Sequence, residues 1–158
     1  MKASIRVGFS FGLTSAIITT LGLMIGLYSS IGTKLAVIGG ILTIAIADAF
    51  SDSLGIHISQ ESNKGNTTRS VWESTIATWA TKFLFGITFL VPVILLELKT
   101  AIFVSIIWGL LVLSYLSYNL GEKKTYKRIQ AVAEHLTIAI IVIIITHYVG
   151  LAIPLVFG

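Results

Sequence analysis

Long apolar runs separated by short polar segments make up almost the whole chain. Five stretches of about twenty or more mostly apolar residues follow one another, over residues 7–28, 35–58, 71–95, 99–119 and 132–156. A helix needs about 20 such residues to cross the hydrocarbon core of a bilayer. The pattern therefore predicts an all-α integral membrane protein, with five transmembrane helices forming a single domain over residues 1–158.

The polar segments between the runs are too short to hold a second domain. Residues 60–70 and 121–128 combine charged residues with the turn formers glycine and asparagine. Residues 29–34 and 97–99 join the remaining pairs more tightly. We therefore expect the first and second helices, and the third and fourth, to be antiparallel neighbours.

Basic residues are distributed unevenly between alternate connections. The formal net charge is +4, yet only two basic residues outside the runs, Lys34 and Lys99, fall on one side of the predicted membrane. Eight fall on the other: Lys2, Arg6, Lys64, Arg69, Lys123, Lys124, Lys127 and Arg128. An excess of Lys and Arg marks cytoplasmic segments. We therefore expect a cytoplasmic N-terminus and an outside C-terminus. We place the protein in a prokaryotic cell membrane. Because the positive charge is explained by topology, we expect no nucleic-acid partner.

The first apolar run carries small residues at helical spacing. They recur every three or four positions, at Gly8, Gly12, Ser15, Thr19, Gly22 and Gly26. Small residues on one face let helix backbones approach closely within a bilayer. We therefore expect this helix to pack on both of its neighbours or on a second copy, and a homodimer formed through it.

Two aspartates lie inside the second run, which is the least expected feature of the sequence. Asp48 and Asp52 are four residues apart, so a helix places both on one face. An aspartate at the bilayer centre costs about 2.5–3.5 kcal/mol on insertion scales, so the pair requires a compensating cation. A bound metal, protons or the basic side chain of Lys82 could supply it. Lys82 lies roughly 16 Å into the third run, counted from Val71 at 1.5 Å per residue.

Oxygen donors surround the two aspartates in the predicted helices. Carboxylates with hydroxyl groups nearby suit Mn2+, Fe2+ or Mg2+, and we take Asp48 and Asp52 as candidate metal ligands. The candidate transport path adds Ser51, Lys82 and, from the first helix, the hydroxyls of Ser15 and Thr19. His57, Glu61 and Glu73 cluster at the cytoplasmic end and could attract cations there, although solvated interfacial side chains would look the same.

The first two runs resemble the vacuolar iron transporter family. The resemblance is carried by FGLTSAIITTLGLMIGL, residues 11–27, and AVIGGILTIAIADAFSDSLGIHIS, residues 36–59. It implies a five-helix dimeric exporter that moves Fe2+ or Mn2+ out of the cytoplasm in exchange for protons, with the metal as substrate and no permanently bound cofactor. Pro92 and the final HYVG, residues 147–150, fit the later helices of the family more loosely.

This chain departs from the family pattern at the expected ligands. Asp48 matches the family acid, but Ser15 stands where the family has an aspartate, Asp52 where it has a methionine and Ile56 where it has a glutamate. An acid gained at Asp52 could replace the one lost at Ser15. The cytoplasmic metal-binding domain of the family is absent, since only residues 60–70 connect the second and third runs.

Two other interpretations stay open. A packing or regulatory membrane protein would use Lys82 and an aspartate as a structural ion pair. A metal-dependent intramembrane enzyme that joins CDP-linked lipids to alcohols would need a D-G-x-x-A-R array, which the sequence lacks. The chain contains no cysteine, so thiolate ligands and cysteine nucleophiles are also excluded. Because the sequence lacks both the D-G-x-x-A-R array and cysteine, we do not expect an enzyme.

Overall fold

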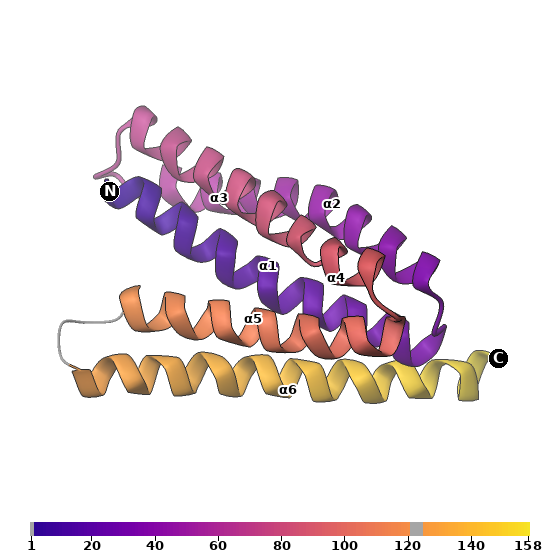
Figure 1. The fold of residues 1–158 in the computed structure, drawn as a ribbon. Helices are drawn as coiled ribbons and strands as arrows, with labels where there is room; N and C mark the ends of the chain where they lie inside the picture. Colours follow the sequence, from indigo (N-terminus) through magenta and orange to yellow (C-terminus); the bar gives the residue numbers. More distant parts are fainter. Residues whose placement is uncertain (1, 121–124) are drawn as a thin grey trace.

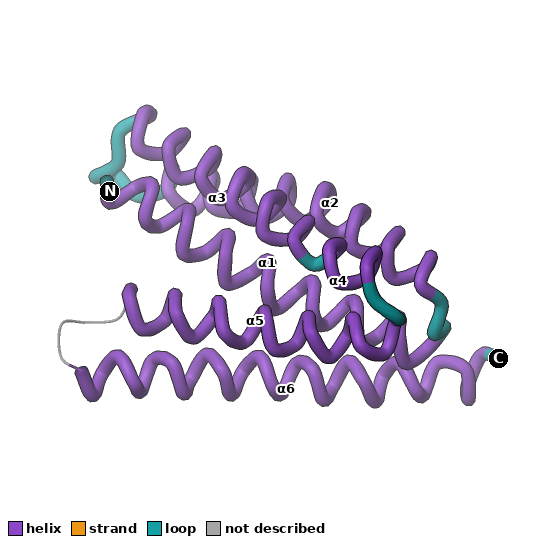
Figure 2. The backbone as a smooth tube through the Cα atoms, viewed as in Figure 1, coloured by secondary structure: helices purple, strands orange, loops and turns teal. Residues whose placement is uncertain are grey.

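The computed structural model describes residues 2–120 and 125–158, in which every regular element is an α-helix (Figures 1 and 2). The helices are α1 (Ala3–Ser30), α2 (Lys34–Glu61), α3 (Thr68–Thr88), α4 (Leu90–Leu95), α5 (Leu98–Leu120) and α6 (Thr125–Phe157).

Five helical segments of the described chain are long and apolar enough to cross a membrane, α3 and α4 together forming one of them. This confirms the predicted helices and indicates an integral membrane protein. α1 and α2 both extend beyond their apolar runs at each end. At 1.5 Å per residue the 28-residue α1 and α2 are about 42 Å long, so they exceed a hydrocarbon core of about 30 Å.

Local sequence sets the helix ends. Gly32, with φ of +66°, turns the chain after α1 in a conformation that favours glycine. The Thr33 hydroxyl then accepts a hydrogen bond from the backbone N–H of Ala36 and begins α2. At the start of α3, Thr67 and Ser70 cap each other's backbone N–H groups in a capping box.

The third span is interrupted, whereas the sequence predicted one continuous helix over residues 71–95. A proline ring clashes with the carbonyl four residues earlier, which for Pro92 is Thr88, the residue where α3 ends. Lys34 lies beside the short helix that follows. Its ammonium donates to the backbone oxygens of Ile94 (2.9 Å) and Leu96 (3.0 Å), which satisfies carbonyls at the end of α4.

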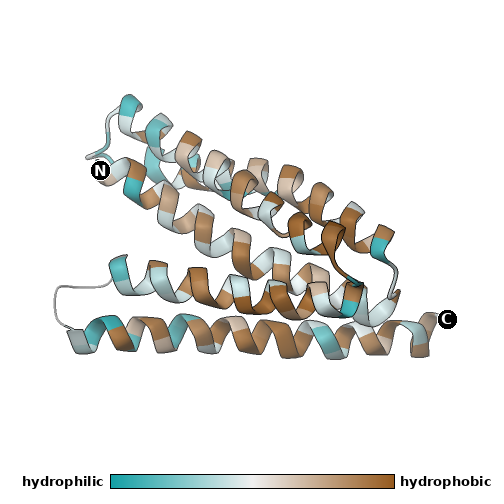
Figure 3. Cartoon of the chain, viewed as in Figure 1, coloured by the Kyte–Doolittle hydropathy of each residue, from teal (hydrophilic) through white to brown (hydrophobic). Residues whose placement is uncertain are grey.

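The described basic residues outside the spans gather mainly at one end of the molecule. The N-terminus, the α2–α3 connection and the start of α6 lie at one end of the molecule, while the starts of α2 and α5, which carry Lys34 and Lys99, lie at the opposite end with the C-terminus (Figure 1). Hydrophilic residues are also densest near the N-terminus (Figure 3). Lys123 and Lys124 lie outside the described residues. The direction of insertion stays a prediction.

Helix α1 forms the centre of the bundle. It packs against α2, α3, α5 and α6 and is the most buried span, whereas α6 is the least buried. Its small residues permit these contacts. A Cβ at Gly8 would lie 2.2 Å from the backbone oxygen of Ser74, and one at Gly150 would lie 2.6 Å from that of Gly26. The small residues of α1 thus pack on helices of the same chain, and the homodimer stays a prediction.

Gly8→Ala and Gly39→Ala form a matched test of this packing. Gly8→Ala forces α1 and α3 apart and should cost about 1–3 kcal/mol, the usual range for overpacking. A Cβ at Gly39 would meet no atom within 4 Å, so Gly39→Ala should keep or slightly raise stability through helix propensity. The measurement is the midpoint of thermal unfolding in detergent. Equal midpoints for the two variants would contradict the packing described.

Candidate functional site

Asp48, Asp52 and Lys82 meet between α2 and α3. The Lys82 ammonium lies 2.6 Å from Asp48 Oδ2 and also donates a hydrogen bond to Asp52 Oδ2. Lys82 is only 1% exposed, so its ammonium cannot extend to water as lysines near helix ends do. The two aspartate side chains are 24% and 21% exposed. One buried cation therefore binds two carboxylates of one helix face.

Ser15 joins this cluster from α1. The Lys82 ammonium donates to Ser15 Oγ (2.7 Å), and Ser15 Oγ donates to Asp52 Oδ2 (2.6 Å). A hydroxyl has one hydrogen to donate and lone pairs to accept, so Ser15 makes both bonds at once. The cluster consequently ties three helices together through a hydroxyl, an ammonium and two carboxylates.

The positions of the four residues follow from helix geometry and close packing. Asp48 and Asp52 are one helical turn apart on α2. Lys82 follows Thr78 by one turn on α3, and a Cβ at Gly12 would lie 2.7 Å from the Thr78 backbone oxygen. Glycine at position 12 thus brings α1 near enough for Ser15 to reach the ion pair.

The depth of the cluster is central in every span that contributes to it. Lys82 lies about midway between Thr68 and Leu95, and Asp48 lies about midway between Lys34 and Glu61. Charged side chains at this depth normally face a cavity or a partner of opposite charge. Here the partner is present within the chain.

The charges in the cluster are unequal. Two ionised carboxylates and one ammonium sum to one negative charge. Asp48 Oδ2 is buried and, although it forms the 2.6 Å ion pair, it receives no hydrogen bond of acceptable geometry. The Lys82 ammonium is thus close to Asp48 Oδ2 but poorly aligned with it, and a hydrogen bond weakens steeply with misalignment. Asp48 is the less satisfied of the two acids.

A groove of about 680 Å³ between α1 and α2 reaches Asp48. Thr19 and Ser51 line it beside the carboxylate, and Leu27 and Ala36 line it nearer the α1–α2 turn. The Thr19 hydroxyl donates to the backbone oxygen of Ser15 (2.9 Å), which leaves its lone pairs free to accept. Asp48 is therefore the member of the cluster that adjoins open space.

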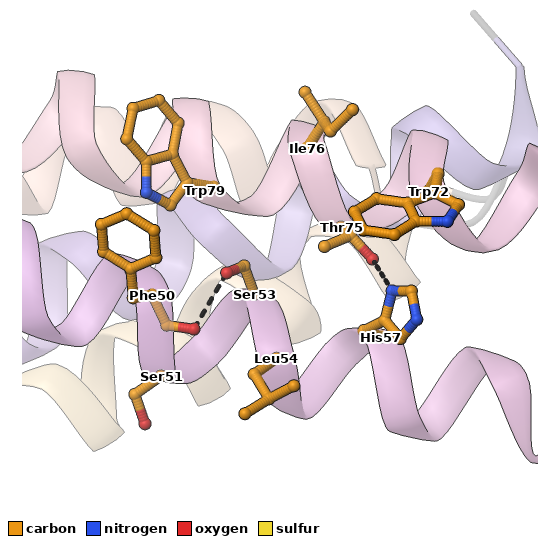
Figure 4. Close-up of a pocket in the computed structure, with 9 residues that line it drawn as sticks. All are labelled: Phe50, Ser51, Ser53, Leu54, His57, Trp72, Thr75, Ile76 and Trp79. Atoms are coloured by element: carbon orange, nitrogen blue, oxygen red, sulfur yellow. Dashed lines mark hydrogen bonds between the residues drawn. The ribbon is translucent and has the colours of Figure 1, made fainter.

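Ser51 lies outside the cluster. Figure 4 shows its side chain on the side of α2 turned away from α3, while Ser53 donates to the backbone oxygen of Phe50 (2.9 Å). Ser51 thus lines the groove between α1 and α2 and does not contact Lys82 as Ser15 does. The residues of the predicted transport path thus fall into two groups. Four form the polar cluster, and the other two, Thr19 and Ser51, line the groove.

The three residues predicted as a cytoplasmic mouth do not converge. His57 Nδ1 lies 3.0 Å from Thr75 Oγ1, and its ring packs edge-on against Trp72 (Figure 4). Glu61 is exposed at the end of α2.

Glu73 instead collects partners at the N-terminal ends of α1 and α3. Its carboxylate accepts from Lys2 (2.5 Å), Ser4 (2.7 Å) and Arg69 (3.0 Å). Its charge is thus already balanced by two cations, and Glu73 fastens the start of α1 to α3.

The assignment of Asp48 and Asp52 as metal ligands stays a prediction. Within residues 2–120 and 125–158, no three His, Cys, Asp or Glu side chains are grouped to hold a metal ion. The two aspartates supply carboxylate oxygens of the right type for a hard or borderline cation. In this conformation the Lys82 ammonium contacts both carboxylates.

Comparison of the chain with models of protein families, with curated proteins and with solved structures found no match. The resemblance to vacuolar iron transporters consequently rests on the sequence segments that carry it.

Removing the lysine tests how far the cluster depends on it. Lys82→Met leaves two partly buried carboxylates without their cation and should lower the free energy of unfolding by about 3 kcal/mol, the lower end of the range for broken buried ion pairs. Adding Asp52→Asn to Lys82→Met should restore part of this loss, which a double-mutant cycle in detergent measures. Lys99→Met, at an exposed lysine, is the control and should change little. Additive effects of the two changes would show that Lys82 and Asp52 do not interact.

Proposed function

We propose that this protein is a membrane transporter that exports a divalent metal cation, Fe2+ or Mn2+, from the cytoplasm in exchange for protons. Asp48 and Asp52 bind the cation, and Ser15 and Thr19 contribute hydroxyl oxygens. The proposal is supported by the resemblance of α1 and α2 to the vacuolar iron transporter family. In this proposal the N-terminus of the protein lies in the cytoplasm. The protein is a homodimer in a prokaryotic cell membrane.

A buried ammonium held between two carboxylates at mid-membrane depth is the observation that carries this proposal. Such an arrangement has the parts of a cation site: two anionic ligands one turn apart, a hydroxyl between helices and a positive charge already bound. If Lys82 moves away, the two carboxylates together match the charge of a divalent metal. Intramembrane ionisable residues of this kind commonly mark ion paths.

Competition for the same oxygens supplies the coupling to protons. A metal that binds both carboxylates requires any proton on them to leave and the Lys82 ammonium to withdraw or lose its own proton. A proton that returns to an aspartate lowers the negative charge that holds the metal. The groove beside Asp48 gives the exchanging ion access along α1 and α2.

One alternative is favoured by a specific observation. Lys82 already has Ser15, Asp48 and Asp52 as partners and is almost completely buried. A protein that needs only a structural link between three helices would show the same contacts. Folded protein without metal flux would favour this alternative.

Metal flux into liposomes separates the two functions. Liposomes that contain the purified protein, an internal metal-sensitive dye and an acidic interior should take up Mn2+ or Fe2+ faster than liposomes at equal pH. Asp48→Asn and Asp52→Asn should each reduce uptake to the rate of empty liposomes, because each removes a carboxylate from the site. Glu134→Gln removes an acid whose side chain contacts Gln130 on the exposed face of α6, and should leave uptake unchanged. Absence of uptake by folded wild-type protein would refute the transporter.

A further inference from the structure

A second groove, of about 800 Å³, lies at the end of the molecule that carries the N-terminus. Residues of α1, α5 and α6 line it, together with Ile56 of α2. In Figure 1, α1 and α5 diverge toward this end. The groove that reaches Asp48 extends instead toward the α1–α2 turn, where Leu27 and Ala36 line it. The two grooves therefore approach the cluster around Lys82 from opposite ends of the bundle.

The second groove runs from the membrane surface nearly to the middle of α1. Ala3 lines it about 20 Å from the middle of that helix, at 1.5 Å per residue, which is beyond the roughly 15 Å half-thickness of a hydrocarbon core. Thr14 lines it about 4 Å from the middle. Between them, Ser10 donates its hydrogen to the backbone oxygen of Arg6 (2.8 Å), which leaves hydroxyl lone pairs to accept from water. The groove thus begins among water and headgroups and continues inward past hydroxyl groups.

Apolar side chains separate the inner end of the second groove from the cluster. Phe11 precedes Ser15 by one helical turn on α1, and Ile56 follows Asp52 by one helical turn on α2. Because α1 and α2 run in opposite directions, both steps lead toward the end of the molecule that carries the N-terminus (Figure 1). Phe11 and Ile56 both line the groove. One apolar residue from each helix therefore lies between the groove and the polar side chains of the cluster.

Access to the cluster differs between its two sides. Asp48 itself lines the groove that extends toward the α1–α2 turn. The second groove ends at Phe11, Thr14 and Ile56, without a lining residue from the cluster. A transporter that works by alternating access opens its central site to one side of the membrane at a time. The described conformation thus has the form of a site open to one side and closed to the other.

Arg6 also lines the mouth of the second groove. It already takes part in an interaction within the protein. It is therefore not a free positive charge that would repel an entering cation.

We propose that the second groove is the water-filled cytoplasmic vestibule of the transport path, and that Phe11 and Ile56 form its closed inner gate. This inference rests on the proposed function, because a metal exported from the cytoplasm has to reach the aspartates from this end. Hydrophobic constrictions close membrane paths by excluding water. When Phe11 and Ile56 move apart, water from the vestibule reaches Ser15 and Asp52, and the cation enters with it.

Cysteine labelling tests the vestibule, because the chain has no native cysteine. Lys64→Cys, in the exposed α2–α3 connection, identifies the vestibule side of the protein in liposomes. A membrane-impermeant cationic methanethiosulfonate should label Thr14→Cys from that same side, because water fills the groove. An unlabelled Thr14→Cys in folded protein would show that lipid or packed side chains fill the groove, and it would overturn the proposal.

Thr19→Cys tests the gate, because Thr19 lines the groove on the other side of the cluster. The same reagent should label it from the opposite side and hardly at all from the vestibule side. Ile56→Ala or Phe11→Ala should each raise labelling from the vestibule side about tenfold or more, since the open form of a two-state protein is commonly about 10% populated or less. Ile76→Ala makes the same truncation on the exposed face of α3 and should change nothing. Unchanged labelling in both gate variants would overturn the gate, as would rapid labelling of Thr19→Cys from the vestibule side with the gate intact.

Labelling and metal uptake separate this inference from the proposed function. Labelling involves no metal, so its result stands whether or not the protein transports one. Absence of metal uptake by folded wild-type protein refutes the transporter, whereas absence of labelling at Thr14→Cys refutes the vestibule. The two gate variants lie on different helices, so the gate is still tested when one of them fails to fold, and gel filtration in detergent identifies the folded variants.

Discussion

A charged lysine in the middle of a membrane span is stable only when carboxylates take the place of water around it. Lys82 meets this requirement through Asp48 and Asp52 of α2 and through Ser15 of α1. The same contacts constrain the fold, because they form only when the first three spans have one register relative to one another. Structure and proposed function thus depend on a single buried ammonium.

Close approach of the helices makes this network possible. Gly8 and Gly12 let the backbone of α1 touch that of α3, and Gly26 and Gly150 do the same for α1 and α6. With α1 held centrally, Ser15 lies within hydrogen-bond distance of a carboxylate from one neighbour and an ammonium from the other. Packing by small residues and placement of the polar side chains are therefore two aspects of one arrangement.

The five helices could be predicted from the sequence because hydrophobic length depends only on local composition. The break before Pro92 also has a local cause, although the apolar pattern runs through it. Contacts between helices were harder to predict from the sequence. Spacing alone places Asp48 and Asp52 on one face. The reach of Lys82 to both acids, and the bridge that Ser15 forms from Lys82 to Asp52, depend on helix rotation and distance. The same is true of Glu73, whose partners Lys2 and Ser4, at the start of α1, stand far from it in sequence.

The central claim is that Lys82 occupies the place of a cation that the two aspartates bind during transport. Anomalous X-ray diffraction from crystals of the protein grown with Mn2+ tests it most directly. The account predicts a manganese peak bound by Asp48 and Asp52, with the Lys82 ammonium withdrawn from both carboxylates. A map with Lys82 still bound to both aspartates and no manganese beside them, at a concentration that supports flux, would contradict it.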